Sequence, residues 1–99
     1  MEILEKNTGD AVELIVSGRL DTTTSPQLES RVHNFAKTTK LLVLDLSAVE
    51  YISSAGLRVV LLAHKLMVGN NGKLLLRKPS EFCRQVFEAT GMDSALNIE

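Results

Sequence analysis

Two adjacent hydroxyl-bearing residues, Ser53 and Ser54, follow an apolar segment and precede the small residues Ala55 and Gly56. The pattern predicts that a buried strand ends here and that a helix begins, so both serines lie where helix amides lack partners within the helix. A serine in this place ordinarily caps its helix by accepting a hydrogen bond from such an amide. The alternative is a hydroxyl that accepts a phosphoryl group, because the small neighbours leave the loop accessible and a helix N-terminus tolerates the added negative charge.

A catalytic serine is a weaker interpretation, because no general base is expected near Ser54. His64 lies ten positions further along the same predicted helix, about three turns away and beyond hydrogen-bond reach. His33 belongs to a different predicted helix. The chain has no G-x-S-x-G turn and no glycine-rich phosphate loop, so neither an enzyme nor a nucleotide or other cofactor is expected.

Asp21 is the other residue with chemistry to offer, in a loop that also contains Thr22, Thr23 and Thr24. An aspartate in such a loop accepts hydrogen bonds from amides two or three residues further on. The sequence therefore predicts an Asx-turn in which the Asp21 carboxylate receives the amide of Thr23 or Thr24.

Alternating and continuous apolar segments predict the elements that position these residues. Strands are expected at 2–5, 11–17, 41–46 and 73–77, and the nearly unbroken run LLVLDL is typical of a strand covered on both faces. Helices are expected at 26–37, with Ser25 as its N-cap, from the serines to about 68, and from Pro79 to Gly91. The order β-β-α-β-α-β-α predicts one α/β domain, 1–99, with a mixed β-sheet of about four strands and helices packed on it.

The second predicted helix is apolar nearly all round, more than one sheet could cover. Burial between the sheet and a neighbouring helix explains most of this pattern. The alternative is that one side, comprising Leu57, Leu61 and His64 and bordered by Arg58 and Lys65, stays exposed as a docking patch.

Composition excludes several classes of protein. The chain has 99 residues, of which 44% are hydrophobic, with 11 basic and 12 acidic residues. Without a basic excess, nucleic-acid binding is not expected. Cys83 is a lone cysteine without a zinc-ligand cluster, so a structural thiol is expected. The first seven residues lack the apolar core of a signal peptide, and no apolar run approaches the roughly 20 residues of a membrane span. We therefore expect a cytoplasmic protein without direct membrane insertion.

Two segments carry a resemblance to a known family. The first is Gly18-Arg19-Leu20-Asp21, and the second is Leu44-Asp45-Leu46-Ser47-Ala48-Val49 leading into Ile52-Ser53-Ser54-Ala55-Gly56-Leu57. Together they resemble the G-x-L-D and D-L-S…(D/S)-S-(S/T/A)-G-L segments of STAS domains in anti-sigma factor antagonists, and the resemblance covers essentially the whole chain.

This resemblance implies a partner-switching regulator of transcription. Its implied partners are an anti-sigma factor with serine kinase activity, bound by the unmodified domain, and a PP2C-type, metal-dependent serine phosphatase that acts on the phosphorylated form. The phosphorylated serine of the family falls on Ser54, with Ser53 as the alternative because it occupies the place of a common family aspartate. The implied partner-binding residues are Asp21, Thr22, Thr24, Ser53, Ala55, Gly56, Leu57, Arg58 and Leu61.

STAS-like domains also serve other assemblies. They occur as cytosolic appendages of anion transporters, as subunits of lipid-transport complexes and as parts of stress-signalling assemblies. A subunit role of this kind, without a sigma factor, is the alternative function.

Overall fold

A computed structural model describes all residues from 1 to 99. Four strands and three α-helices follow one another, with a short 3₁₀ turn near the C-terminus. Their bounds are β1 Glu2–Thr8, β2 Ala11–Leu20, α1 Ser25–Ala36, β3 Leu41–Ile52, α2 Ser54–Gly69, β4 Lys73–Arg77, α3 Glu81–Thr90 and η1 Met92–Ser94.

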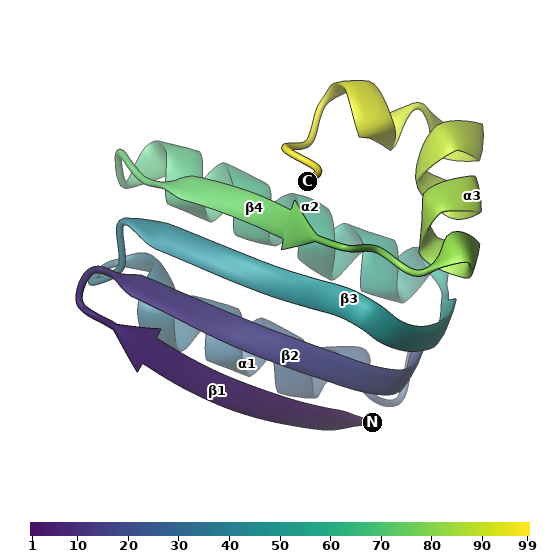
Figure 1. The fold of residues 1–99 in the computed structure, drawn as a ribbon, viewed down its shortest axis with the longest axis horizontal. Helices are drawn as coiled ribbons and strands as arrows, with labels where there is room; N and C mark the ends of the chain where they lie inside the picture. The colour runs from purple at the N-terminus through teal and green to yellow at the C-terminus, as the bar shows by residue number, and fades with distance from the viewer.

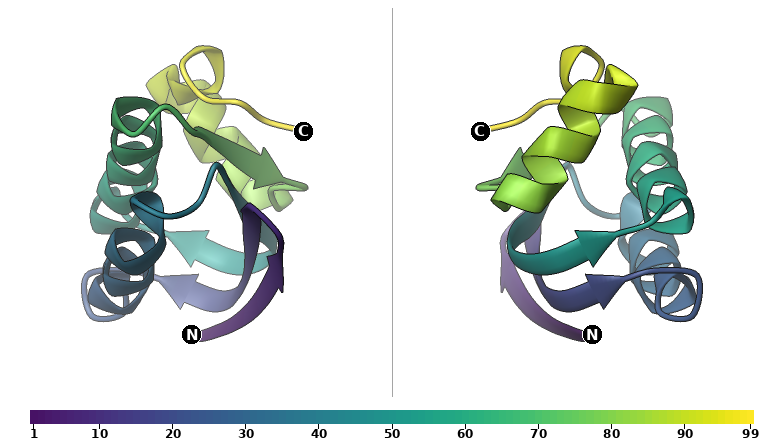
Figure 2. Two further views of the ribbon diagram at one scale, coloured as in Figure 1. Left: turned by 90° about the vertical axis from the view of Figure 1, so that its left-hand side faces the viewer. Right: turned by 90° about the vertical axis from the view of Figure 1, so that its right-hand side faces the viewer.

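The strands form one mixed sheet in the order β1-β2-β3-β4 (Figure 1). The first pair is antiparallel, and β3 lies parallel to both β2 and β4. Each parallel pair is joined through a helix, as the geometry of parallel strands requires. The two crossover helices, α1 and α2, lie side by side on one face of the sheet, while α3 packs against β3 away from them (Figures 1 and 2). This architecture confirms the α/β fold with a mixed four-stranded sheet.

The core lies between the sheet and the paired helices α1 and α2. Alternate residues of the strands point toward this layer, and Leu14, Leu44 and Leu76 are completely buried in it. Val43 faces the opposite way and is also buried, which confirms that β3 is covered on both faces along this run. Every α-helix also contributes buried side chains to the core, among them Leu28, Val32, Val59, Val60, Ala63, Met67, Cys83 and Phe87.

Both long strands continue beyond their predicted ends. β2 was expected to stop at Ser17 but reaches Leu20, and β3 was expected to stop at residue 46 but reaches Ile52. Two shifts of register, between Ile15 and Ser17 and between Gly18 and Arg19, interrupt the alternation that reveals a strand in sequence. Gly18 adopts φ +91°, a backbone conformation that suits glycine and is typical of a bulge rather than of a strand end.

The helix starts also differ from the predictions. Ser25 is not the N-cap of α1 but its first residue, and its hydroxyl donates to the carbonyl of Asp21. Thr24 occupies the N-cap position, but its side chain does not cap the helix. Its hydroxyl instead accepts the amide of Asp21 and donates to the carbonyl of Arg19. In α3 the helix begins at Glu81, since the hydroxyl of Ser80 accepts the amide of Cys83 and so caps the helix.

The two ends of the chain complete the edges of the sheet. β1 runs to Thr8, three residues beyond its predicted end at residue 5, in full antiparallel register with β2. After η1, Ile98 forms a parallel bridge with Leu76 on the outer edge of β4. No helix has both the length and the apolarity that crossing a membrane would demand.

Buried and exposed leucines of the sheet allow a test of where its stability originates. Leu44→Ala should lower the free energy of unfolding by about 3 kcal/mol, because it opens a cavity in a fully buried site. Leu4 is 62% exposed, so Leu4→Ala should change the free energy of unfolding by less than about 0.5 kcal/mol. Urea denaturation of both variants measures the difference. Equal losses would show that the core does not lie on the face described.

Candidate functional site

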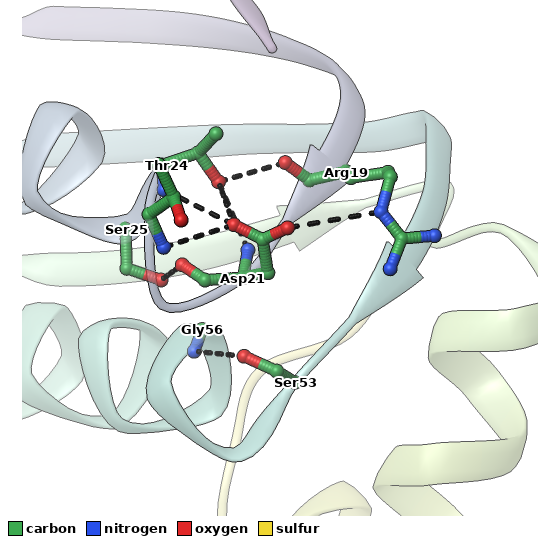
Figure 3. A network of polar contacts seen from close by, with 7 residues as sticks. Arg19, Asp21, Thr24, Ser25, Ser53 and Gly56 are labelled. Atoms are coloured by element: carbon green, nitrogen blue, oxygen red, sulfur yellow. Dashed lines mark hydrogen bonds and ion pairs between the residues drawn. The ribbon is translucent and has the colours of Figure 1, made fainter.

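The two segments singled out in the sequence meet at one edge of the sheet. β2 and β3 are parallel, and the last pair in their register is Leu20 with Ile52. The amide of Ser53 donates to the carbonyl oxygen of Leu20 at 2.9 Å, which ties the start of α2 to the end of β2. Figure 3 shows the Asp21 loop and the Ser53 turn facing each other across this edge.

Asp21 organises the β2–α1 loop as the sequence predicted. Its Oδ1 accepts the amides of Thr23 and Thr24 at 3.0 and 3.1 Å, which confirms the Asx-turn. Its Oδ2 lies 3.7 Å from Nε of Arg19 (Figure 3). The hydrogen bond from the Thr24 amide holds the pKa of Asp21 below its ordinary value of 3.8, and the Thr23 amide and the Arg19 charge act in the same direction.

Thr24 links this turn to the strand before it. Its hydroxyl accepts the amide of Asp21 at 2.9 Å and donates to the carbonyl of Arg19 at 2.8 Å. Thr22, in contrast, is exposed and its side chain makes no hydrogen bond within the chain. The loop therefore holds Asp21 and Thr24 in fixed positions and presents Thr22 outward.

The two adjacent serines have different surroundings. Ser53 is the N-cap of α2, with an extended backbone at φ −95° and ψ 177°, and its half-buried hydroxyl accepts the amide of Gly56 at 3.4 Å. Ser54 is the first residue of α2, is exposed, and uses its hydroxyl in no hydrogen bond. The capping role suggested for this pair thus falls to Ser53, and the Ser54 hydroxyl is left free at the surface.

Gly56 lets the start of α2 lie directly against the ends of β2 and β3. A Cβ at this position would stand 2.8 Å from the carbonyl oxygen of Leu20 and 2.9 Å from Cγ1 of Ile52. Any larger residue would push the helix, and the serines with it, away from the strand ends. The glycine of the second motif therefore has a packing role.

The outward face of α2 begins at Ser54. Helical periodicity places Arg58, Leu61, Lys65 and Val68 on the same face, and all of these are exposed except Leu61, which is half-buried. The exposed side therefore carries two cations and two apolar side chains.

The flanks of that face hold the other residues of the predicted patch. Leu57 and His64 are half-buried, and Leu57 also packs against the core. The predicted patch of Leu57, Leu61 and His64 therefore remains partly exposed, while the residues of α2 that point toward the sheet explain most of its apolarity through burial.

A shallow groove of about 140 Å³ runs between the starts of α1 and α2. It brings together Thr22, Ala55 and Arg58, three of the residues implied by the resemblance. Pro26 and Glu29 of α1 form its other side. Ala55, the residue after Ser54, lines the groove, which therefore begins next to the serine in the chain.

A stack of side chains beside the loop was not foreseen from the sequence. The Cζ of Arg19 lies 4.2 Å from the ring centre of Tyr51, and the Tyr51 and Phe82 rings are 5.3 Å apart. Phe82 is 39% exposed. The stack joins β2, β3 and the start of α3. The stack could have been predicted only from the pairing of Arg19 on β2 with Tyr51 on β3. The two bulges shift the strand register, so this pairing cannot be recognised in the sequence.

A family model described as the STAS domain matches residues 3–99. The chain belongs to the STAS family. The anti-sigma-B factor antagonist of Listeria monocytogenes is 30% identical over 100 residues, which cover 100% of this chain and 87% of the relative. BtrV of Bordetella bronchiseptica is 39% identical over 84 residues, or 84% of this chain and 72% of the relative. The family suggested by the two motifs is thereby confirmed.

Solved structures agree on the fold. SpoIIAA in its unphosphorylated form superposes with a TM-score of 0.85 at 18% identity, covering 99% of this STAS domain and 88% of that chain. The phosphorylated form of SpoIIAA, described as a Bacillus cell fate determinant, gives a TM-score of 0.79 at 19% identity over 99% of this chain and 91% of its own. Both forms share the architecture described above.

Substitution at Gly56 tests the close approach of α2 to the strand ends. Gly56→Ala should lower the free energy of unfolding by about 1 to 3 kcal/mol, because the added methyl meets backbone and buried side chains. Gly69→Ala is the matched control, since nothing lies within 4 Å of a Cβ there. Its effect should be neutral or stabilising by about 0.5 kcal/mol. Urea denaturation compares them, and a neutral Gly56→Ala would contradict the packing role.

The Asp21 turn should make stability depend on pH. Because the pKa of Asp21 is lowered in the folded chain, its carboxylate stabilises the fold above pH 3.8. That contribution is lost as the pH falls through the lowered value. Asp21→Asn should therefore melt at a lower temperature than wild type at pH 7, and the gap should narrow below pH 3.8.

Thermal melts at pH 7 and near pH 3 measure this gap. Asp93→Asn is the control, because Asp93 is exposed and takes part in no ion pair. A gap between wild type and Asp21→Asn that stays constant with pH would exclude the turn as its cause.

Proposed function

We propose that this STAS domain is an anti-sigma factor antagonist that binds an anti-sigma factor while Ser54 is unmodified and is released when Ser54 is phosphorylated. Membership of the STAS family supports the proposal. So does the likeness, over the whole chain, to a Listeria protein named as an anti-sigma-B factor antagonist. The partner is an anti-sigma factor that is also a serine kinase.

The choice of Ser54 rests on one observation, the different state of the two hydroxyls. Ser53 accepts the Gly56 amide and is half-buried, whereas Ser54 is exposed and unengaged. In the transfer, the Ser54 oxygen forms a bond to the γ-phosphorus of ATP and gives its proton to a base of the kinase, while the bond between that phosphorus and the β–γ bridging oxygen breaks and ADP leaves. A PP2C-type phosphatase reverses the state by hydrolysing the phosphoserine to serine and inorganic phosphate.

The phosphate acts locally. It adds a charge of roughly −1.5 to −2 at a helix N-terminus, where negative charge is tolerated and the helix is not disrupted. The fold of SpoIIAA is similar to this chain in both its unphosphorylated and phosphorylated forms, so this architecture accommodates the modified state. The switch therefore works by changing the charge of the docking surface on a rigid scaffold.

The docking surface surrounds Ser54. It comprises the Asp21 loop, the turn between β3 and α2, and the outward start of α2. Its residues are Asp21, Thr22, Thr24, Ser53, Ala55, Leu57, Arg58 and Leu61, whereas Gly56 supports it from beneath. The fixed Asx-turn and the close approach of α2 hold both halves of this surface in one arrangement before a partner arrives, which lowers the entropic cost of binding.

Affinity capture tests the proposal. Tagged wild-type protein and the Ser54→Ala, Ser54→Glu and Ser53→Ala variants serve as baits in a lysate of the native organism. Wild type and Ser54→Ala should retain an anti-sigma factor with a kinase fold, and Ser54→Glu should lose it because of the added charge. With the recovered kinase and ATP, Ser53→Ala should still incorporate phosphate and Ser54→Ala should not, as measured by mass spectrometry.

Other outcomes lead to other conclusions. Phosphate on Ser53 alone would transfer the acceptor role to that residue. Recovery of the same membrane or lipid-transport components by wild type and Ser54→Glu would show a structural subunit, and the switch would be refuted.

A further inference from the structure

Arg58 lies one helical turn beyond Ser54 on the outward face of α2. Both residues are exposed. In an α-helix the Cβ atoms of residues four apart are about 5–6 Å from each other, within reach of a long side chain. A group attached to the Ser54 oxygen thus points into the space that the Arg58 side chain can sweep.

Arg58 has no counter-ion within the chain. It takes part in none of the ion pairs, and α2 contains no acidic residue. Two carboxylates of neighbouring elements already have other side chains beside them. Glu29, across the groove, lies 3.7 Å from Nε2 of His33, and Asp21 lies beside Arg19.

We propose that Arg58 exchanges counter-ions when Ser54 is phosphorylated. In the unmodified chain the guanidinium meets a carboxylate of the docked anti-sigma factor, and in the phosphorylated chain it pairs with the phosphate on Ser54. The inference rests on the function proposed above. It identifies Arg58 as the residue that responds to phosphorylation of Ser54 and thereby changes the binding of the partner.

The geometry favours the phosphate pair. An anion that precedes a cation by four residues is the better of the two orders in a helix, because it also suits the helix dipole. The planar guanidinium offers paired donors to phosphate oxygens. The Ser54 hydroxyl makes no hydrogen bond that phosphorylation would have to break.

Charge complementarity favours an acidic side chain of the partner as the other counter-ion. The outward face of α2 presents Arg58 and Lys65 without any carboxylate, next to the apolar Leu61. Arg58 also lines the groove with Thr22 and Ala55, where a partner covering Ser54 would contact it. When the phosphate draws Arg58 toward Ser54, the partner loses an attractive contact and meets a negative group at the same time.

The phosphate pair can be measured without any partner. Protein carrying phosphoserine at position 54, installed during translation, is titrated by ³¹P NMR. The second pKa of the phosphate should be lower in wild type than in Arg58→Gln by about 0.3, the value expected for one exposed ion pair. Arg58→Lys should fall between them, and Lys65→Gln, three turns away from Ser54, should match wild type. Identical titrations of wild type and Arg58→Gln would overturn the exchange.

The proposed contact between Arg58 and the partner is tested by measuring the affinity of the unphosphorylated chain for the purified anti-sigma factor. Arg58→Gln should weaken binding about threefold to fivefold, and the loss should shrink at high salt. An affinity of Arg58→Gln equal to that of wild type would show that Arg58 makes no such contact with the anti-sigma factor. If wild type itself does not bind an anti-sigma factor, the proposed function fails, while the ³¹P titration still decides whether Arg58 holds the phosphate.

Discussion

The parallel pairing of β2 with β3 is the interaction on which the rest of the site depends. Parallel strands end at the same edge of a sheet, so the loop that follows β2 and the turn that follows β3 emerge side by side. The pairing continues through two bulges to Leu20 and Ile52, and the hydrogen bond from the Ser53 amide to Leu20 extends it by one residue. If β3 ended at residue 46, as its apolar run suggested, Ser54 would begin its helix without contact with the Asp21 loop.

The two serines divide two tasks that a single residue could not perform. A hydroxyl that caps a helix is turned inward and held by an amide, as in Ser53. A hydroxyl that accepts a phosphoryl group, the role proposed for Ser54, has to be accessible and free to rotate, and the Ser54 hydroxyl is exposed and unbonded. Because the cap fixes where α2 begins, it also fixes the direction in which Ser54 and Arg58 project.

The sequence predicted the order of elements, the mixed sheet and the Asx-turn, because each rests on local patterns. Apolar runs mark buried strands. An aspartate in a loop accepts hydrogen bonds from the free amides two and three residues further along the chain, wherever that loop lies in the fold. The features that it missed depend on contacts between distant segments. Gly18 resembles a strand end but forms a bulge, and the stack of Arg19, Tyr51 and Phe82 follows from strand register and from α3. The difference between Ser53 and Ser54 also required three-dimensional geometry, since both are serines before the same helix.

The close fit of Gly56 against Leu20 affects how genetic screens of this site should be interpreted. A collection of random variants selected for loss of signalling would include many changes at position 56, and their clustering beside Ser54 would suggest a recognition residue. These alleles would act instead by lowering the amount of folded protein, as temperature-sensitive alleles do. Alleles at the exposed positions 22 and 58 would leave protein abundance unchanged. Steady-state abundance therefore separates the residues that build the surface from those that we propose to contact the partner.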